Sequence, residues 1–430
     1  MRKVVVVSSD AMVGEDLEIY KDMPSYKKLF EGGAMVRKVS SIYPTVTFPA
    51  HATMMTGFYP GHHGIFSNMQ LIPGSDPTPW QWNSDFLHTT DIFKEAKKKG
   101  LSTAAILWPV TAFNPAIDYH IADYWAQSDE ETTVDAFRRA GANDGVVRII
   151  EKNMHLFEGN ERVHPYRDDF GMTCAADIIR EYAPDLLLVH PANIDDVRHK
   201  WGVFGPHIKE ALKDLDRWML MIASALEDRG ILEETDIFLV SDHGQLDVRR
   251  NIALNVIFRE HGLIDVDEKG DVRDWKAWCL SNGMSAIVFL KDKNDKALHD
   301  EVRSLLDGLL EEGLYGFSRI FEEEEAMKLY TYGGPFSFVL ETDGYTAFAD
   351  SYERPLVKPL DNSDYRFGAA THGYLPEKGP QPLLVARGPH IKAGAVVEKS
   401  HIVNEAPTYA RILGFKIPGA DGSAIEEILK

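Results

Sequence analysis

The chain has 430 residues, of which 44% are hydrophobic and 26% charged, and its formal net charge is −20. This composition is typical of a folded globular protein and excludes a disordered or fibrous one, while the length predicts a large domain with a smaller insertion. The acidic balance argues against binding to nucleic-acid polymers, because such binding depends on Lys and Arg side chains that displace counterions. With only two cysteines, a disulfide scaffold and a cysteine-rich metal site are excluded as well.

The N-terminal segment predicts neither a secretory leader nor a membrane anchor. Its apolar run from Val4 to Val7 is interrupted by Ser8 and Ser9, which makes it too short for the core of a signal peptide. No stretch of the sequence approaches the roughly 18 apolar residues of a membrane span. We therefore expect a cytoplasmic protein with no membrane partner, and the sequence carries no signal for a particular oligomeric state.

Short apolar runs alternate with helical patterns along the chain, which is typical of an α/β protein with a mostly parallel sheet and helices on both faces. One amphipathic helix should begin at Pro206 and end before Gly230, because its apolar residues recur every three or four positions. The predicted core strands are residues 3–8, 103–107, 185–189, 236–240 and 382–386.

The pattern changes between residues 251 and 367. This stretch holds strand-like segments at 286–290 and 336–340, with a helical segment at 296–311 between them. We expect it to form a smaller α+β cap inserted into the main domain. The main domain would then comprise residues 1–250 and 368–430.

One pair of side chains has the spacing of metal ligands. Asp195 and His199 are four residues apart, so on a helix both would project from the same face and could bind one cation. A carboxylate with an imidazole suits zinc, and manganese, cobalt or iron would also accept this pair. The spacing alone is a weak signal, so it indicates a site only if further ligands lie nearby.

Four more side chains of ligand type fall near the ends of predicted core strands. Asp10 follows the first strand, Asp242 and His243 end the strand at 236–240, and His372 precedes the last strand. In open α/β sheets, ligands bind at the edge where the strands end. Asp10 and His372 alone are more simply explained as a helix cap and a loop residue, whereas Asp242-His243-Gly244 at the end of an apolar strand is a sharper signal. Six such side chains at one edge predict a metal centre.

The segment YPTVTFPAHATMMTG at 43–57, followed by YPGHHGIFSN at 59–68, is the most informative part of the sequence. It resembles the nucleophile segment of the nucleotide pyrophosphatase/phosphodiesterase family within the alkaline phosphatase superfamily, where Thr-Phe-Pro-x-His carries the attacking threonine. Further matches follow in the family's order at Trp108-Pro109, Asp195-x-x-x-His199, Ser241-Asp242-His243-Gly244 and His372-Gly373-Tyr374. The resemblance implies an alkaline phosphatase-like fold and a phosphoester hydrolase.

The resemblance also implies a role for individual residues. Thr47 would attack phosphorus and form a covalent threonyl phosphate, while Asn68 and the backbone N–H of Phe48 would bind a phosphoryl oxygen. Two divalent ions, Zn²⁺ or else Mn²⁺, would be the cofactors, because a threonine hydroxyl needs a metal to stabilise its alkoxide. One ion would be held by Asp195, His199 and His372, and the other by Asp10, Asp242, His243 and the Thr47 oxygen.

Some features of this segment leave alternatives open. Thr47 has local rivals in Thr45, Thr53 and Thr56, and it could instead cap a helix ahead of Pro49. The aromatic residues after the nucleophile either line the substrate pocket or pack in the core. They are Trp80, Trp82, Trp108, Tyr124 and Trp125.

The chain also departs from the family at two positions. Ala50 stands where the family commonly has Asn. His190, five residues before Asp195, stands where the family commonly has an aromatic residue that stacks on a nucleobase. We expect His190 to contact the substrate, either by stacking or by bonding a polar group, so a preference for nucleotides does not follow directly.

The function that we predict is a phosphodiesterase or nucleotide pyrophosphatase acting on a small phosphoester, with a nucleotide as one option. A phosphomonoesterase or phosphonate hydrolase could use the same metal pair, and a cationic Arg or Lys near Thr47 would favour a monoesterase because monoesters carry more charge. A noncatalytic binding protein fits less well, since nucleophile, donor and six ligands are all present. A sulfatase is excluded, because the Cys/Ser-x-Pro-x-Arg segment that it needs is absent.

Overall fold

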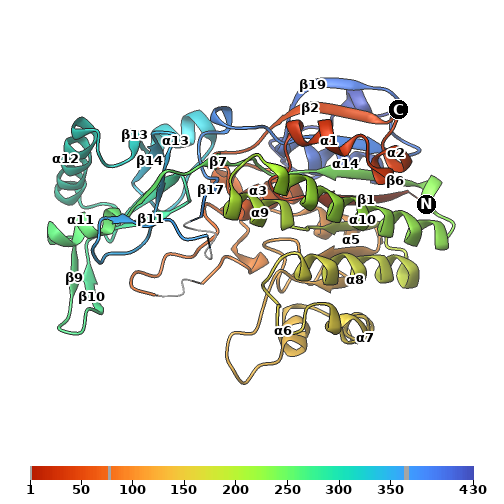
Figure 1. Ribbon diagram of the computed structural model, residues 1–430, viewed down its shortest axis with the longest axis horizontal. Coiled ribbons are helices and arrows are strands. Elements are labelled where there is room, and N and C mark those ends of the chain that lie inside the picture. Colours follow the sequence, from red (N-terminus) through yellow and green to blue (C-terminus); the bar gives the residue numbers. More distant parts are fainter. Residues whose placement is uncertain (1, 76–78, 363–367) are drawn as a thin grey trace.

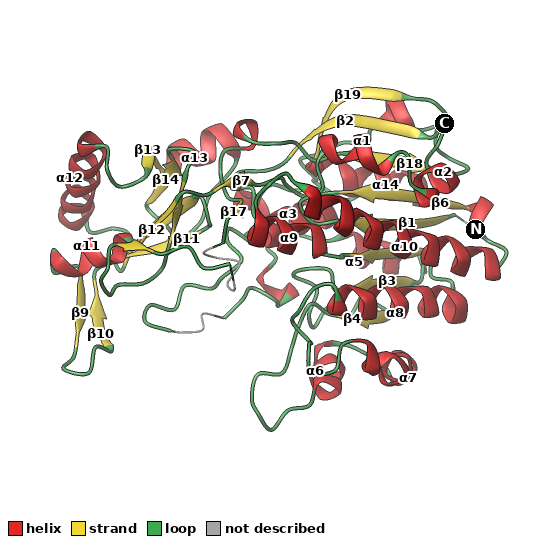
Figure 2. Cartoon of the chain, in the orientation of Figure 1, coloured by secondary structure: helices red, strands yellow, loops and turns green. Residues whose placement is uncertain are grey.

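The computed structural model describes residues 2–75, 79–362 and 368–430, and an eight-stranded sheet forms its centre (Figures 1 and 2). Neighbouring strands are parallel throughout this sheet, except that β18 runs antiparallel to both β2 and β6. The expectation of an α/β fold with a mostly parallel sheet is thereby confirmed. In spatial order the strands are β19 (Val396–His401), β2 (Ala34–Ser40), β18 (Leu384–Arg387), β6 (Thr235–Val240), β1 (Lys3–Ser8), β5 (Leu186–Val189), β3 (Thr103–Ile106) and β4 (Tyr119–Ile121).

Helices cover both faces of this sheet, because alternate residues of its central strands enter two separate cores. Val5 and Val7 of β1 face one core, and Val4 and Val6 face the other. The first core is completed by α2 (Pro24–Leu29), α7 (Asp144–Asn153), α8 (Tyr166–Tyr182) and α10 (Pro206–Asp228). The second is completed by α3 (Thr47–Thr56), α5 (Ile92–Lys98) and α14 (Glu405–Leu413).

A second, antiparallel sheet lies at the end of the molecule opposite the two termini (Figure 1). It has its own apolar core, to which α11 (Leu254–Glu260), α12 (Lys296–Glu312) and α13 (Glu323–Tyr330) contribute. Its strand order is β11 (Ala277–Ser281), β12 (Ser285–Leu290), β14 (Phe338–Thr342) and β13 (Phe317–Glu322). The cap limits at 251 and 367 stay a prediction, and residues 363–367 lie outside the described ranges.

The remaining elements are short and join the two sheets or decorate them. The strand pairs are β9 (Ile264–Val266) with β10 (Val272–Trp275), and β7 (Leu246–Asp247) with β17 (Ala370–Thr371), while β8 (Arg250–Ile252) pairs with both β15 (Thr346–Phe348) and β16 (Val357–Lys358). The other helices are α1 (Leu17–Tyr20), α4 (Pro60–His63), α6 (Thr133–Ala140) and α9 (Asn193–Trp201). Within the described part of the chain, no helix is long and apolar enough to cross a membrane.

Candidate active site

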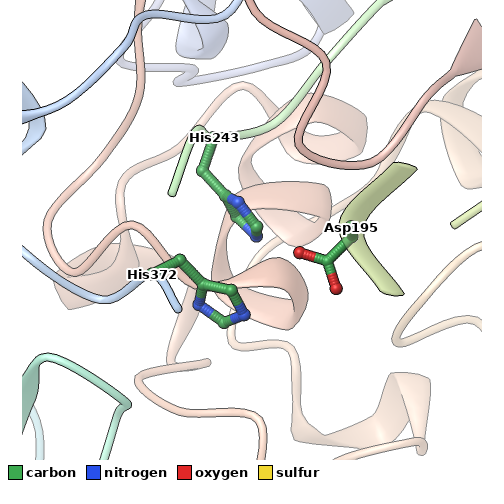
Figure 3. A group of neighbouring side chains, drawn as sticks. All are labelled: Asp195, His243 and His372. Carbon is green, nitrogen blue, oxygen red and sulfur yellow. The ribbon is translucent and has the colours of Figure 1, made fainter. Parts of the chain in front are cut away.

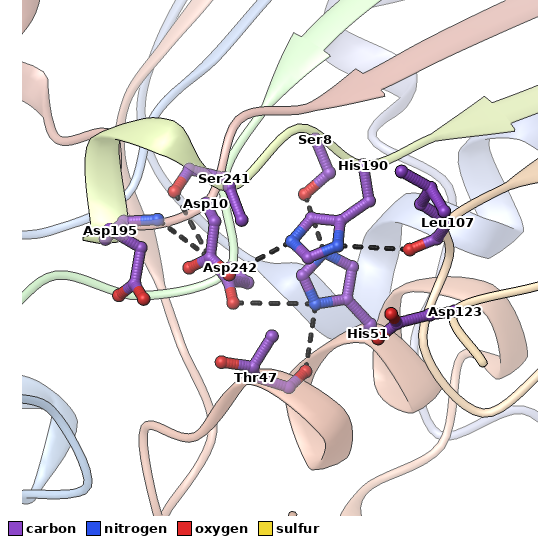
Figure 4. Close-up of polar contacts among 12 residues, drawn as sticks. Ser8, Asp10, Thr47, His51, Leu107, Asp123, His190, Asp195, Ser241 and Asp242 are labelled. Carbon is purple, nitrogen blue, oxygen red and sulfur yellow. Dashed lines mark hydrogen bonds and ion pairs between the residues drawn. The ribbon is translucent and has the colours of Figure 1, made fainter. Parts of the chain in front are cut away.

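The six predicted ligands and Thr47 come together at the edge of the central sheet where β1, β5 and β6 end. Figure 4 shows Asp10, Asp195, Asp242 and Thr47 at this edge. Asp10 follows β1, and Asp242 and His243 follow β6. Asp195 and His199 lie on α9, which follows β5, so the helical spacing expected for this pair is confirmed. The other two residues arrive from farther along the chain.

His372 directly follows β17, and its position depends on the glycine after it. Gly373 has φ +102, and a Cβ added there would lie 1.7 Å from the carbonyl oxygen of Asn282. Any other residue would therefore push the backbone away from the loop between β11 and β12. The Gly373 N–H also donates to the Thr45 carbonyl at 2.9 Å, which ties the His372 loop to the segment that carries Thr47.

Two groups of side chains have ligand atoms close enough to share an ion. Asp10, Asp242 and His243 form one group, and Asp195, His243 and His372 form the other (Figure 3), with all ligand atoms of a group within 4.8 Å of one another. His243 belongs to both groups, with its Nε2 3.1 Å from Asp242 Oδ2 and 3.6 Å from Asp10 Oδ1. The grouping thus resembles the predicted pair of sites, with His243 between them.

His199 belongs to neither group, but its hydrogen bonding also fits a cation. Its Nδ1 must donate to the Ala370 carbonyl at 2.7 Å, because a carbonyl only accepts. The Nε2 lone pair of the neutral ring then faces Asp195 Oδ2 at 3.1 Å. Two acceptors at this distance require a proton or a metal ion between them, and the carbonyl contact orients the ring as in many metal sites.

The carboxylates of this site are crowded and buried in a way that also favours a cation. Asp10 Oδ1 and Asp242 Oδ2 accept no hydrogen bond from any described residue. Burial raises the pKa of Asp242 to about 7. Burial, together with the charges of Asp195 and Asp242, raises the pKa of Asp10 well above its ordinary value. Divalent ions would compensate this cost, so the residues present fit a pair of bound metals.

Thr47 is the first residue of α3, with its hydroxyl at the edge of both ligand groups. Its Oγ1 lies 3.1 Å from His243 Nε2. Val46 is the N-cap of α3, and the hydroxyl of Thr47 caps nothing. Beside it, the Phe48 N–H donates to Asn68 Oδ1 at 2.8 Å. The Asn68 Nδ2 forms no hydrogen bond with the described part of the chain, so it remains available as a donor next to Thr47.

The three rival threonines are buried and hydrogen-bonded elsewhere. Thr45 Oγ1 donates to the Tyr374 carbonyl at 3.0 Å. Thr53 Oγ1 bonds His63 Nε2 at 3.0 Å, and Thr56 Oγ1 donates to the Ala52 carbonyl at 2.7 Å. Thr47 is therefore the threonine of this segment whose hydroxyl faces the ligand groups.

Two further histidines, His51 and His190, form hydrogen bonds with residues of the site (Figure 4). His51 Nδ1 donates to the Thr47 carbonyl at 2.9 Å, and its Nε2 bonds the Ser8 hydroxyl at 2.9 Å. His190 lines the cavity, but its Nε2 lies 3.0 Å from Asp10 Oδ2 and its Nδ1 3.2 Å from the Leu107 carbonyl. Both ring nitrogens of His190 thus have protein partners. The expected contact of His190 with substrate stays a prediction, and it would involve the face or the edge of the ring.

A cavity of about 170 Å³ opens over Thr47, and part of its wall was not expected from sequence. Of the five aromatic candidates, Trp80 and Trp125 line the cavity. Trp108 is fully buried in the core. The unexpected lining residues, from the region around α6 to α8, are Asp123, Arg162, His164, Arg167 and Asp168. They follow no predicted core strand, so the position after a strand, which pointed to the predicted metal ligands, could not point to them.

Fold and site together place the chain in the alkaline phosphatase superfamily. The family model for "Type I phosphodiesterase / nucleotide pyrophosphatase" matches residues 4–374. The chain belongs to this family.

Named relatives and solved structures agree with this membership. The yeast (Saccharomyces cerevisiae) ectonucleotide pyrophosphatase/phosphodiesterase 1 is 26% identical over 66% of this chain, and human family member 1 is 22% identical over 54%. The chain spans 38% and 22% of the length of these two proteins. The structure of murine ectonucleotide pyrophosphatase / phosphodiesterase 5, an inactive variant in complex with AMP, superposes with a TM-score of 0.67 at 17% identity over all of both chains.

Proposed function

We propose that this protein is a metal-dependent phosphodiesterase of the nucleotide pyrophosphatase type that acts on a small phosphoester, with a nucleotide as one candidate. The observation that carries this proposal is the Thr47 hydroxyl, which lies beside two groups of carboxylates and imidazoles at the end of the sheet. AMP is bound in the murine structure named above. A protein of similar fold in complex with a nucleotide supports a similar substrate class here.

The proposed cofactors are two divalent metal ions, with Zn²⁺ as the first candidate and Mn²⁺ as the second. Such ions would lower the charge repulsion at the site and polarise phosphoryl oxygens. Mixed carboxylate and imidazole ligands suit both metals. The residues that would hold the two ions are Asp10, Asp195, His199, Asp242, His243 and His372, with the Thr47 oxygen.

In the proposed reaction, Thr47 Oγ1 attacks phosphorus while the bond to the leaving-group oxygen breaks, which gives a threonyl phosphate. Water then attacks the same phosphorus atom and releases Thr47. The Phe48 N–H and Asn68 Nδ2 donate to a phosphoryl oxygen during both steps, since both lie at the N-terminus of α3 beside Thr47. For this, Asn68 Oδ1 must release the Phe48 N–H when substrate binds.

The experiment that tests the mechanism compares Thr47→Ala with Thr53→Ser after zinc loading. We expect Thr47→Ala to lower hydrolysis of bis-p-nitrophenyl phosphate by at least about 1,000-fold without loss of bound metal or fold. Thr53→Ser keeps its hydroxyl beside His63 and should stay near the wild-type rate. Acid quenching of the wild type during turnover should trap Thr47 esterified by p-nitrophenyl phosphate, because only one of the two p-nitrophenolate groups leaves in the first step. Near-native turnover by Thr47→Ala would show that another group attacks.

A phosphomonoesterase is the second candidate, and one observation favours it. The basic side chain of Arg167 lines the same cavity as Thr47, where it also pairs with Asp123. A cation near the scissile phosphorus would help to bind the additional charge of a monoester. Comparing kcat/KM for p-nitrophenyl phosphate and bis-p-nitrophenyl phosphate separates the two functions, and we expect the diester to be the better substrate.

We keep a cytoplasmic location and the absence of membrane and nucleic-acid partners as predictions. The net charge of −20 supports the last of these. Fractionation of the source cells, with enzyme activity followed in each fraction, tests the location directly.

A further inference from the structure

The cavity over Thr47 has an outer wall that the proposed chemistry does not use. It begins at Phe48, whose ring centroid lies 5.1 Å from that of Trp80. Trp80 in turn lies 5.8 Å from Trp125, edge to face. The guanidinium carbon of Arg162 lies 4.4 Å from the centre of the Trp125 ring. A series of contacting aromatic rings, of which Phe48 is buried, thus leads from the residue after Thr47 to a cation.

Arg162 differs from the other basic residues of this wall in having no acidic partner. Arg167 Nη2 pairs with Asp123 Oδ1 at 2.6 Å, and His164 Nδ1 lies 2.7 Å from Asp168 Oδ2. Among the residues that the structure describes, none forms an ion pair or a hydrogen bond with the exposed Arg162 side chain. Its position over Trp125 orients the guanidinium without neutralising it. A bound anion would therefore meet one unmatched positive charge here.

The neighbouring cavity, towards the second sheet, has the opposite character. It has a volume of about 310 Å³ and shares Asn68 and His372 with the cavity over Thr47. The carboxyl side chains of Asp350 and Glu353 line it, and among the described residues no lysine or arginine does so. Like charges would keep a second anionic group out of this cavity and direct it towards Arg162.

We propose that Arg162 forms an anion subsite for the substrate. The phosphoester would carry a planar group, which packs against Trp80, and beyond it a second anionic group that the guanidinium binds. Carboxylate and phosphate share this chemistry, because the planar guanidinium donates two parallel hydrogen bonds to either. The aromatic rings separate Arg162 from Thr47, so the subsite selects the remote part of the substrate. This inference rests on the proposed phosphodiesterase function and narrows its substrate class.

The first test uses three diesters with the same p-nitrophenolate leaving group. They are p-nitrophenyl phenyl phosphate and its p-carboxyphenyl and p-phosphonophenyl counterparts, so two of them carry a remote anion. We expect wild-type kcat/KM to favour the charged diesters by about tenfold, mainly through KM, because a charge-assisted contact is gained. The better of the two charged diesters identifies whether carboxylate or phosphate is preferred.

Three variants assign this preference to the guanidinium. Arg162→Gln should lose it and hydrolyse the uncharged diester within about twofold of the wild-type rate, whereas Arg162→Lys should retain part of it. Arg148→Gln is the matched control, since this exposed α7 side chain pairs with Glu181 outside the cavity, and it should keep the full preference. Equal kcat/KM for all diesters in the wild type, or an unchanged preference in Arg162→Gln, would overturn the subsite.

A binding measurement separates this inference from the proposed function. Calorimetric titration compares phenylphosphonate with p-carboxyphenylphosphonate, neither of which has a scissile ester. The subsite is supported if the wild type binds the carboxylated compound more tightly and Arg162→Gln loses this difference. This holds even if no diester is hydrolysed, and that result would contradict only the proposed function. Equal affinities with normal diester turnover would remove the subsite and leave the function.

Discussion

Asn68 illustrates how a single side chain can hold the nucleophile segment and serve the reaction. Its Oδ1 accepts from the Phe48 N–H at 2.8 Å in this structure, and its side chain lines the same cavity as Thr47. We expect Asn68→Ala to lower kcat by about 100- to 1,000-fold with smaller effects on KM, because a transition-state donor is lost. Metal content and melting temperature should change little. A kcat within about threefold of wild type would show that Asn68 only organises the loop.

At the same scale, the sequence indicated which Asp and His side chains would lie close together, but not their hydrogen-bond partners. Asp195 and His199 could be paired because four residues make one helical turn. His190 was expected to meet substrate, yet its imidazole bonds Asp10 and the Leu107 carbonyl. Such partnerships join residues 180 positions apart, so only the folded chain reveals them.

At the scale of elements, strands buried on both faces could be predicted and edge strands could not. β1 and β6 are continuous apolar runs inside the sheet, and their predicted limits are within one residue of those observed. β2 and β19 lie at one side of the sheet and carry several exposed polar residues, so neither has the apolar run of a core strand. The wall around Arg162 belongs to loops between helices, whose positions depend on long-range packing.

The junction between α3 and α4 gives a prediction for the helix that carries Thr47. His63 Nδ1 accepts from the Ile65 N–H at 3.1 Å, so its Nε2–H donates to Thr53 of α3. Burial lowers the pKa of His63 to about 3. Because the pKa in the folded state is below the unfolded value, this residue contributes stability above about pH 6.5 that is lost as the pH falls towards 3.

His63→Asn should therefore make the protein less sensitive to acid. In urea unfolding of chelator-treated protein, the free energy of unfolding should fall less steeply from pH 6 to pH 4, by up to about 1.4 kcal/mol per pH unit. At pH 8 the variant should be less stable than wild type by about 1 to 2 kcal/mol, since the bond to Thr53 is lost. An identical pH slope in both proteins would mean that His63 is not the titrating group.

For the whole molecule, the proposed metal site should lower the stability of the metal-free fold. Asp10 and Asp242 place carboxyl groups in the buried centre, where no described residue donates a hydrogen bond to Asp10 Oδ1 or Asp242 Oδ2. Metals that bind the folded state stabilise it by mass action. The stability of this fold should therefore depend on metal more strongly than its large hydrophobic cores alone would suggest.

Asp242 makes this dependence measurable. Burial raises its pKa to about 7 in the metal-free protein. Since the folded value is above the unfolded one, the contribution of Asp242 to stability is present below about pH 4 and is lost as the pH rises through 7. Removal of metal by chelation should consequently lower the melting temperature more at pH 7.5 than at pH 5, because the carboxylates ionise against one another only at the higher pH.

Asp242→Asn should change the melting temperature in opposite directions in the chelated and the zinc-loaded protein. In the chelated protein at pH 7.5 it should raise the melting temperature above that of chelated wild type, because an uncharged amide replaces the buried charge. The amide oxygen can still accept from the Ala11 N–H, as Asp242 Oδ1 does at 3.2 Å. In zinc-loaded protein the same substitution should lower both metal content and melting temperature. Differential scanning calorimetry with metal analysis on the same samples checks both signs. If the variant is less stable than wild type in both states, repulsion between the buried carboxylates does not destabilise the metal-free fold.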